Sequence, residues 1–338
     1  MKEIKLSGDF IIGPDRPVFF IADIGANHNG SLLKAKKLID LAAKAGVNAV
    51  KFQSYRADYL MNQKYHPEGY NLIRKYQFPM AWNGILKKYS EKKGLLFLTT
   101  PFDLETVDYL EDLNVAFYKI ASSDITFYRL IEKIGKTGKP VIISTGGADI
   151  NEIKNAVRIL KTTGNRKIIL LHAIVNYPCD YDEVNLSFMP VLGEKFKVPF
   201  GLSDHTLGTE VAVAAVTYGA SVIEKHFTDN RHRKGPDHLH SMEPDEFRSM
   251  VISAGNVQQA IGKPYKIINR SEKRRLKKAR RAFYAARDIC KGEIFNGNNV
   301  RELRPKGEIS AAQANIVFGK KAKKAISNLE MIRKKNIL

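Results

Sequence analysis

The chain has 338 residues, of which 44% are hydrophobic and 27% are charged, and this is the composition of a soluble globular protein. The N-terminal sequence MKEIKLSGDF lacks the apolar segment of a signal peptide, and no stretch approaches about 18 uninterrupted apolar residues. We therefore expect a cytoplasmic protein without membrane contact. The length fits a barrel of ~250 residues followed by a small second domain.

The net charge of +20 is concentrated near the C-terminus. Residues 263–338 hold 22 of the 55 basic residues and only 6 of the 35 acidic ones, with the densest run at 271–281. We interpret 1–262 as one domain, 263–281 as a basic linker and 282–338 as a small domain, β-rich because of its Gly/Asn turns. A nucleic-acid partner is the alternative explanation of the charge. We favour a solvated linker and a field that attracts anionic substrate, since no nucleic-acid module accompanies the basic run.

Eight short apolar runs occur between residues 19 and 229, and nearly every one ends in polar residues. The runs are FFIADIGANHNG (19–30), AVKFQSY (49–55), LLFLTTPF (95–102), AFYKIASSD (116–124), PVIISTGG (140–147), IILLHAIVNYP (168–178), PFGLSDHT (199–206) and VIEKHFTD (222–229). Buried strands with functional groups at their C-terminal ends are typical of a (β/α)₈ barrel with its active site on the top face. The predicted fold class is therefore α/β, a TIM barrel followed by a small β-rich domain.

The segments between these runs have the apolar period and the C-terminal glycines of amphipathic helices. The predicted helices are 32–46, 103–113, 151–164, 210–220 and 243–262. Because each helix joins two apolar strands, we expect a parallel sheet that is covered on both faces.

Two further segments do not fit the simple alternation. The connection 56–94 is long, and it predicts a helix over 80–93 preceded by an extended loop, 56–79, above the barrel mouth. The first 18 residues alternate and turn, which predicts a hairpin that closes the bottom of the barrel.

His205 and His226 end the seventh and eighth predicted strands. Neighbouring strands of a barrel bring their ends close together, so both imidazoles can reach one ion. Two neutral imidazoles completed by water suit a borderline divalent metal, and Mn²⁺ is our first choice, with Mg²⁺ or Co²⁺ as alternatives. Such an ion would act as a Lewis acid on a carbonyl oxygen. A purely structural role for these two histidines is the competing interpretation.

Lys51 and Lys119 lie inside apolar strands, where an ammonium group is expensive to bury without a counter-ion. Side chains that could bind an anion end the same or neighbouring strands, namely Gln53, Thr99, Thr100, Ser122, Ser123, Ser144 and Ser203. This combination predicts a ligand with two or three negative charges that carries phosphate and carboxylate groups. Alternatively, the lysines pair with structural carboxylates, for which Asp23, Asp124 and Asp204 are the candidates.

The chain resembles the sialic acid (N-acetylneuraminate) synthase family, the phosphoenolpyruvate-condensing enzymes that make nonulosonic acids. The matching motifs occur in the family's order and cover nearly the whole chain. They are IADIGANHNG, VKFQ, TTPFD, YKIASSD, ISTGG, NYP, GLSDHTLG, ASVIEKHFT, GPDH with SMEPDEF, and KGEIF with LRPKGEIS. The last of these resembles the antifreeze-like (SAF) domain of that family.

The resemblance implies a transferase that joins phosphoenolpyruvate to the open-chain aldehyde of an N-acylated hexosamine and releases phosphate through C–O cleavage. Our first choice of acceptor is N-acetylmannosamine, which gives N-acetylneuraminate. The implied phosphoenolpyruvate ligands are Lys51, Lys119, Thr100, Ser122, Ser144 and Ser203. The aldehyde oxygen would be held by a metal on His205 and His226.

Further roles are implied by the resemblance alone. Gln53, Tyr177 and Asp237 resemble sugar-binding positions. Arg304 resembles an arginine that the C-terminal domain places over the partner subunit's active site, which implies a domain-swapped homodimer whose exchange is carried by 263–281. The implied catalytic residues are Asp23, Lys51, Lys119 and Arg304.

The chain departs from the family pattern at three places. Asp23 stands where the family usually has Glu, so its carboxylate reaches less far by one methylene, and Asp124 likewise replaces a Glu. The segment before NYP usually reads Cys-Thr-Ser or Cys-Thr-Asn, but here it is residues 173–175, Ala-Ile-Val. Asn176 could replace the lost polar group only by a shift of one position.

Three alternatives stay open. The acceptor could be a 2,4-diacetamido-trideoxyhexose, which would make the chain a legionaminic or pseudaminic acid synthase. The acceptor could also carry a 6-phosphate, given the excess of basic residues. The third alternative is a non-catalytic binding protein on a degenerate barrel, for which the Ala-Ile-Val segment is the main support.

Overall fold

The computed structural model describes residues 2–338. They form two compact units, of which the first ends at Gly262 and the second spans Lys263–Leu338. Each unit has its own hydrophobic core, so we describe them one at a time.

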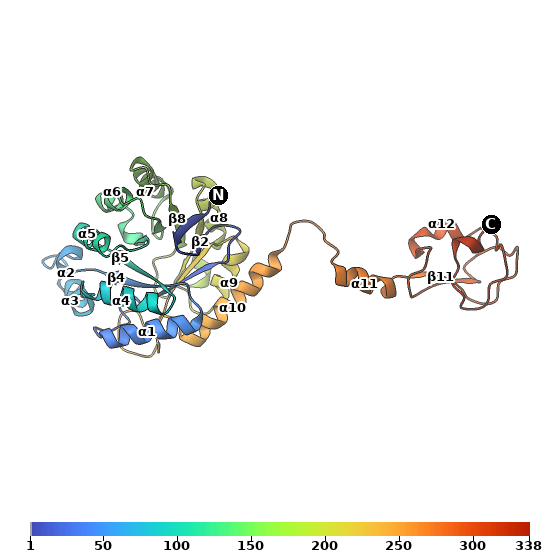
Figure 1. Cartoon of the computed structure of the whole chain (residues 1–338), viewed down its shortest axis with the longest axis horizontal. Coiled ribbons are helices and arrows are strands. Elements are labelled where there is room, and N and C mark those ends of the chain that lie inside the picture. The colour runs from blue at the N-terminus through green and yellow to red at the C-terminus, as the bar shows by residue number, and fades with distance from the viewer. Residues whose placement is uncertain (1) are drawn as a thin grey trace. The chain divides into compact units, whose positions relative to one another are not determined.

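The first unit is built on eight parallel strands, as the sequence predicted (Figure 1). The strands are β3 (Phe19–Asp23), β4 (Ala49–Ser54), β5 (Leu96–Pro101), β6 (Tyr118–Ile120), β7 (Val141–Ser144), β8 (Ile168–Ala173), β9 (Phe200–Asp204) and β10 (Val222–His226). They are hydrogen-bonded in the order β5-β4-β3-β10-β9-β8-β7-β6, and β5 lies against β6, which closes the ring. This confirms the (β/α)₈ barrel.

The lower half of the barrel interior is filled with apolar side chains. Strand residues alternate between the interior and the outer face, so one apolar set such as Phe19, Ile21 and Leu98 fills the inside. The antiparallel strands β1 (Ile4–Ser7) and β2 (Phe10–Ile12) join the same cluster and close the floor, which confirms the predicted hairpin. The apolar floor fills the lower interior, and the polar cavity described below lies at the C-terminal ends of the strands.

Helices cover the outside of the barrel (Figure 1). Their bounds are α1 (Leu32–Ala45), α4 (Trp82–Lys92), α5 (Leu104–Asp112), α6 (Tyr128–Lys136), α7 (Ile150–Thr162), α8 (Met189–Phe196), α9 (Glu210–Thr217) and α10 (Pro244–Ile261). Local signals set their ends. Ser31 caps α1 by accepting a hydrogen bond from the backbone of Lys34, and Gly46 ends this helix in the left-handed conformation. The helices predicted over 32–46, 80–93 and 243–262 are confirmed.

The prediction of an extended loop over 56–79 is wrong. This segment contains two helices, α2 (Ala57–Leu60) and α3 (Pro67–Tyr76). Helix α3 begins with a proline in its first turn, and the ring of His66 accepts a hydrogen bond from the backbone of Gly69. Tyr70 on this helix is buried and its hydroxyl donates to Asp58.

The second unit is small and contains few regular elements. It begins with α11 (Arg270–Ala279), which lies inside the predicted linker, starts at a capping box of Asn269 and Glu272, and buries none of its side chains. The antiparallel pair β11 (Ala282–Ala285) and β12 (Val300–Leu303) and the short α12 (Ala314–Val317) follow. Their apolar side chains form a separate core around Phe283 and Phe295.

Within residues 2–338, no helix is long and apolar enough to cross a membrane.

Candidate active site

A polar cavity of about 190 Å³ opens at the C-terminal ends of the barrel strands. Its lining contains most of the predicted site residues and Ser123, which the sequence also offered as an anion ligand, together with Glu224, Phe102 and Ala121, which were not predicted. The predicted residues in this lining are Asp23, Lys51, Gln53, Thr100, Lys119, Ser122, Ser144, Tyr177, Ser203, His205 and His226. Strand alternation explains the arrangement, because residues two apart on one strand, such as Glu224 and His226, point into the same barrel interior.

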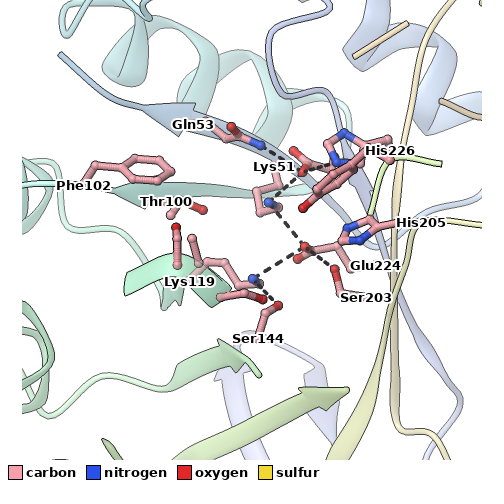
Figure 2. Close-up of a pocket in the computed structure, with 15 residues that line it drawn as sticks. Lys51, Gln53, Thr100, Phe102, Lys119, Ser144, Ser203, His205, Glu224 and His226 are labelled. Carbon is pink, nitrogen blue, oxygen red and sulfur yellow. Dashed lines mark hydrogen bonds and ion pairs between the residues drawn. The ribbon is translucent and has the colours of Figure 1, made fainter. Parts of the chain in front are cut away.

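Two buried lysines and two buried carboxylates form the centre of this pocket (Figure 2). The Nζ atom of Lys51 lies 2.7 Å from Oδ2 of Asp23 and 3.3 Å from Oε1 of Glu224. The Nζ atom of Lys119 lies 3.6 Å from the same Oε1 of Glu224 and donates to the hydroxyl of Ser144 at 2.6 Å. Glu224 therefore joins the two ammonium groups, and Ser203 donates to it from the next strand at 3.2 Å.

The two lysines titrate differently because their surroundings differ. Burial alone would lower the pKa of Lys51, but the carboxylates of Asp23 and Glu224 overcome this effect and raise it above its ordinary value. Burial lowers the pKa of Lys119 to about 8, because Glu224 compensates only in part and the charge of Lys51 opposes protonation. Of the two pocket lysines, Lys119 is therefore the one whose positive charge is less completely compensated by carboxylates in the free protein.

Glu224 is the main residue that the sequence interpretation missed. Of the three carboxylates named as counter-ions, Asp23 alone pairs with a pocket lysine, and the second partner is Glu224. Asp204 points to the outer face of the barrel and pairs with Lys225 instead. The alternation in Val-Ile-Glu-Lys-His (222–226) held the signal, since it places Glu224 on the same face as His226.

Three residues of the barrel domain that were predicted to bind substrate, Asp124, Asn176 and Asp237, do not line the pocket. Asp124 lies in the short 3₁₀ helix Ser122–Asp124, where burial raises its pKa to about 6. Asn176 is exposed and donates to Glu183 at 2.7 Å, so it does not replace the polar group lost before NYP. Val175 instead lines an adjoining cavity of about 310 Å³, which shares Ser122 with the main pocket.

His205 and His226 lie on one wall of the pocket, with their ring centroids 5.6 Å apart. Nδ1 of His205 lies 2.6 Å from the carbonyl oxygen of Ile174, so Nδ1–H donates there and Nε2 keeps its lone pair. Burial lowers the pKa of both histidines, most strongly that of His226, and this keeps both rings neutral. Neutral imidazoles are the form that binds metal ions.

The geometry of this histidine pair fits one divalent ion. An imidazole nitrogen binds a first-row metal at about 2.1 Å, so two rings on one ion have centroids within roughly 6.5 Å of each other. No group of three or more His, Cys, Asp or Glu side chains suited to a metal occurs within residues 2–338. A bound ion would therefore take its remaining ligands from water and from a reactant.

Aromatic contacts surround the histidine pair. The ring of Tyr177 lies 4.2 Å from that of His205, and His240 packs edge-on against His226 at 4.8 Å. His240 is buried, and burial lowers its pKa to about 4. The sequence interpretation did not single out His240, because it lies in an irregular segment without a period to mark its orientation.

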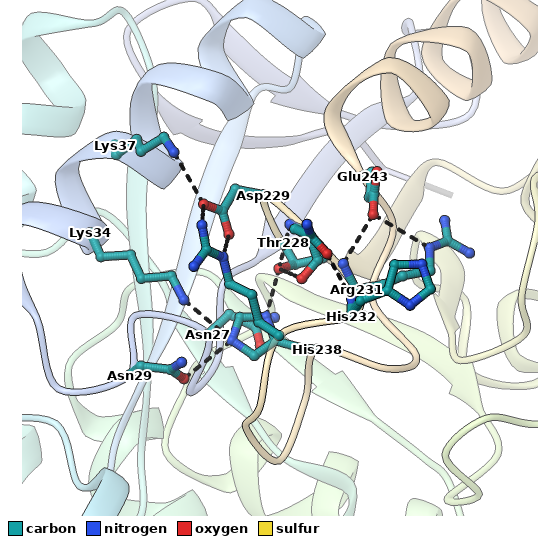
Figure 3. Close-up of polar contacts among 12 residues, drawn as sticks. Asn27, Asn29, Lys34, Lys37, Thr228, Asp229, Arg231, His232, His238 and Glu243 are labelled. Carbon is teal, nitrogen blue, oxygen red and sulfur yellow. Dashed lines mark hydrogen bonds and ion pairs between the residues drawn. The ribbon is translucent and has the colours of Figure 1, made fainter.

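Asp237 lies beside this wall, on the segment that follows β10. Its Oδ2 accepts a hydrogen bond from the backbone of Ala26 at 2.8 Å, and burial raises its pKa to about 6. The next residue, His238, is fully buried, and its ring nitrogens contact the hydroxyl of Thr228 at 2.6 Å and the ammonium of Lys34 at 3.3 Å (Figure 3). These contacts hold the segment that carries Asp237 against the barrel.

Gln53 completes this side of the pocket by donating from Nε2 to Asp23 at 3.2 Å. The remaining predicted residue, Arg304, follows β12 in the second unit. Its role over a partner's active site stays a prediction.

Fold and pocket together define an enzyme of the (β/α)₈-barrel class, with a cationic, hydroxyl-rich site for a small anion at the C-terminal ends of the strands. Comparisons with known proteins are more specific. A model of the NeuB family matches residues 38–266, and a model of the SAF domain matches residues 280–338. The chain belongs to the NeuB family, the nonulosonic acid synthases, and carries a SAF domain at its C-terminus.

Individual relatives agree with this assignment. The chain is 38% identical over 332 residues to the N,N'-diacetyllegionaminic acid synthase of Campylobacter jejuni. This alignment covers 94% of this chain and 99% of the relative. It is 44% identical over 323 residues to an uncharacterized protein of Methanocaldococcus jannaschii, covering 96% and 95% of the two chains. The crystal structure of N-acetylneuraminic acid synthetase from Leptospira borgpetersenii superimposes with a TM-score of 0.76 at 37% identity, over 81% of this chain and 95% of that one.

The Glu224→Gln variant tests the electrostatic description of the pocket. Glutamine keeps the size of the side chain but removes the charge that raises the pKa of Lys119, so we expect this pKa to fall below about 8. NMR titration of lysine-labelled protein, with the Lys119 signal assigned from Lys119→Arg, measures the shift. An unchanged pKa for Lys119 would show that Glu224 does not compensate its charge.

Proposed function

We propose that this chain is a nonulosonic acid synthase that condenses phosphoenolpyruvate with the open-chain aldehyde of an N-acylated hexosamine and releases phosphate. The observation that carries the proposal is the Lys51–Glu224–Lys119 cluster facing the neutral His205/His226 pair across one cavity. The lysine cluster suits a small organic phosphate, and the histidine pair could hold a divalent ion that would polarise a carbonyl oxygen. An aldol-type condensation requires both in contact.

The phosphoenolpyruvate subsite is proposed at the lysines and hydroxyls of the pocket. Lys51 and Lys119 supply two buried cations, and charge-assisted hydrogen bonds to phosphate or carboxylate oxygens are about twice as strong as neutral ones. The hydroxyl of Thr100 is buried without a hydrogen-bond partner, although buried polar groups are normally paired. A ligand oxygen would satisfy it. The other proposed ligands are Ser122, Ser144 and Ser203.

The metal site is proposed at His205 and His226, with Mn²⁺ preferred and Mg²⁺ or Co²⁺ as alternatives. Both rings are neutral and close enough for one ion, and the hydrogen bond to Ile174 fixes the tautomer of His205 that presents Nε2. A divalent ion held there would polarise the carbonyl oxygen of the acceptor.

In the proposed reaction, C3 of phosphoenolpyruvate attacks the aldehyde carbon, and the new alkoxide takes up a proton. Water adds at C2 and loses one proton. The bond between C2 and the bridging phosphate oxygen of the tetrahedral adduct then breaks while the proton of the C2 hydroxyl passes to the departing phosphate, which gives the keto acid and phosphate. Oε2 of Glu224 is buried and has no partner, so we assign it as the acceptor of the proton from water. Lys51 and Lys119 hold the phosphate and carboxylate in place while the C–C bond forms.

Asp23 keeps Lys51 charged and oriented, and its Oδ1 also accepts from the backbone of Gly25 at 3.0 Å. Both oxygens of this shorter carboxylate already accept hydrogen bonds or ion pairs from Lys51, Gln53 and the backbone of Gly25. We therefore assign Asp23 to orientation of Lys51 and Gln53, and proton transfer to Glu224.

The acceptor is proposed to lie along Gln53, Tyr177 and Asp237, beside the histidine pair. N-acetylmannosamine, the precursor of N-acetylneuraminate, stays our first choice. A 2,4-diacetamido-trideoxyhexose is the second candidate, and it is favoured by the 38% identity to the legionaminic acid synthase of Campylobacter jejuni. The two acceptors share the reacting aldehyde and N-acyl group, so the same machinery serves either one.

We further propose that the enzyme is a domain-swapped homodimer in which Arg304 of one subunit completes the site of the other. An arginine there would donate to the acyl carbonyl and exclude water from the reacting carbons. The exposed segment 263–281 would carry the chain from one subunit to the next.

Release of phosphate from phosphoenolpyruvate is the direct test of the proposed activity. With Mn²⁺ we expect turnover with N-acetylmannosamine, its 6-phosphate or a 2,4-diacetamido-trideoxyhexose, and loss of turnover after chelation by EDTA. His226→Ala should abolish the metal-dependent rate. The matched control is His172→Ala, which removes a buried strand-end histidine that lies outside the pocket and contacts the carbonyl of Val184. Metal-independent turnover, or no release with any acceptor from folded protein, would contradict the proposal.

The pH profile tests the role of Lys119. Its ammonium is present below about pH 8 and is lost as the pH rises through that value. We therefore expect kcat/KM for phosphoenolpyruvate, which reports the free enzyme, to fall about tenfold per pH unit above about 8. In Lys119→Arg the guanidinium stays charged, so the residual activity should lack this limb. A wild-type profile that stays flat to pH 10 would exclude Lys119 as the anion-binding cation.

Mixing two inactive variants tests whether Arg304 acts across subunits. In a heterodimer of His226→Ala with Arg304→Ala chains, one of the two sites has both an intact His226 and an intact Arg304 from the partner. Mixed and reassembled variants should therefore regain activity that neither has alone. If Arg304 acts within its own chain, or not at all, mixing will restore nothing.

A further inference from the structure

A buried ion pair lies on the outer wall of the barrel, directly behind the histidine pair. Lys225 of β10 donates from Nζ to Oδ2 of Asp204 on β9 at 2.6 Å, and the two side chains are only 2% and 1% exposed. They point away from the pocket and share the outer face with Leu202 and Ile223, which pack in the core beneath the helices.

Thr206 closes the network around this ion pair. The ammonium of Lys225 also donates to the carbonyl oxygen of Thr206 at 2.6 Å. Oδ1 of Asp204 accepts from the backbone N–H of Thr206 at 2.9 Å and from its hydroxyl at 2.8 Å. The side chain of Lys225 therefore spans from β10 to the residues on both sides of His205.

The location of this link explains what it can control. The parallel register between β9 and β10 runs to the pair Asp204–Lys225, one residue before each histidine. Beyond this pair, the backbone carbonyls of the two histidines accept hydrogen bonds from other segments of the chain. The carbonyl of His205 accepts from Cys179 at 2.9 Å, and that of His226 accepts from Met242 at 2.9 Å. The bond from Lys225 to Thr206 thus connects the two strand ends at the level of the histidines.

Stability is a weak explanation for such a pair. Replacement of buried ion pairs by well-packed neutral residues is often neutral or stabilising, whereas the pair does fix one geometry. Residues outside a metal's ligands commonly orient those ligands and tune metal affinity.

We propose that Lys225 and Asp204 are positioning residues, which fix the separation of His205 and His226 and thereby set the affinity of the metal site. This inference rests on the proposed function, because it assumes that the two histidines hold a divalent ion. Neither residue touches a reactant. Both act through the strand ends that carry the ligands.

The test uses the full-length double variant Asp204→Asn/Lys225→Met. Asparagine keeps an acceptor for Thr206, and no unpaired charge remains in the wall, so the variant is designed to fold. A single Asp204→Asn or Lys225→Met change would leave one buried charge without its partner. It is therefore expected to lower Tm more than the double change. The measured quantities are the Kd for Mn²⁺ by electron paramagnetic resonance, Tm, and the absorption spectrum of the Co²⁺-loaded protein.

The control is Ser54→Ala/Thr99→Val. The hydroxyls of Ser54 and Thr99 form an equally buried link of 2.8 Å across β4 and β5, which lie two and three strands from β10. Thr99 is not in the pocket lining, so the expectation that it could bind an anion is wrong, and its neighbour Thr100 lines the pocket instead. Any effect that follows from general loosening of the barrel wall should appear in this control as well.

We expect Asp204→Asn/Lys225→Met to bind Mn²⁺ roughly tenfold or more weakly than wild type, with a changed Co²⁺ spectrum, while the control loses Tm but keeps its Kd. A Kd within twofold of wild type in folded Asp204→Asn/Lys225→Met would overturn the inference and leave the proposed function intact. Wild-type protein that binds no Mn²⁺, or that binds it equally after His226→Ala, would remove the proposed metal site and this inference together.

Discussion

Two ammonium groups buried at the open end of a barrel are the constraint on which the rest of this structure depends. Lys51 and Lys119 lie at the C-terminal end of the interior, where burial without compensation would cost several kcal/mol each. Glu224 lies within 4 Å of both ammonium groups, and Asp23 saturates the remaining charge of Lys51. Lys119 is left under-compensated, with a pKa of about 8, and this is the property that an anionic reactant can use.

The scaffold holds this cluster in place by being rigid below it. The apolar floor, closed by the hairpin β1–β2, fills the lower barrel, so the charged side chains cannot relax downward. Strand alternation then divides the work of each strand between its two faces. On β10, Glu224 and His226 face the pocket, whereas Lys225 faces the outer wall and bonds to Asp204. One pentapeptide thus contributes to the anion site, the proposed metal site and the link between strands.

Much of the fold was predictable because barrel strands are marked twice, by continuous apolar runs and by polar residues at their ends. The segment 56–79 was mispredicted because its polar composition hid the three-residue spacing of Tyr70, Ile73 and Tyr76, which lies on the less exposed side of α3. In such short helices, capping and one buried ring decide the conformation more than average hydrophobicity.

The site was predictable where a side chain's direction follows from strand period, and less so elsewhere. The positions of Lys51, Lys119, His205 and His226 follow from their strands. The position of Glu224 follows from the same alternation, because it lies two residues before His226 on β10 and so shares its face. Asn176 and His240 lie in irregular segments, where the side-chain direction depends on local bonds such as that from Asn176 to Glu183.

The measurement that tests the central claim most directly is the fate of the bridging oxygen of phosphoenolpyruvate. The proposed reaction breaks the C2–O bond after water has added at C2, with Glu224 placed to accept the proton from that water. Phosphoenolpyruvate labelled with ¹⁸O at the enol oxygen should therefore give phosphate that contains the label, as mass spectrometry would show. Label retained in the sugar acid would mean cleavage between phosphorus and oxygen, which contradicts the mechanism proposed for this pocket.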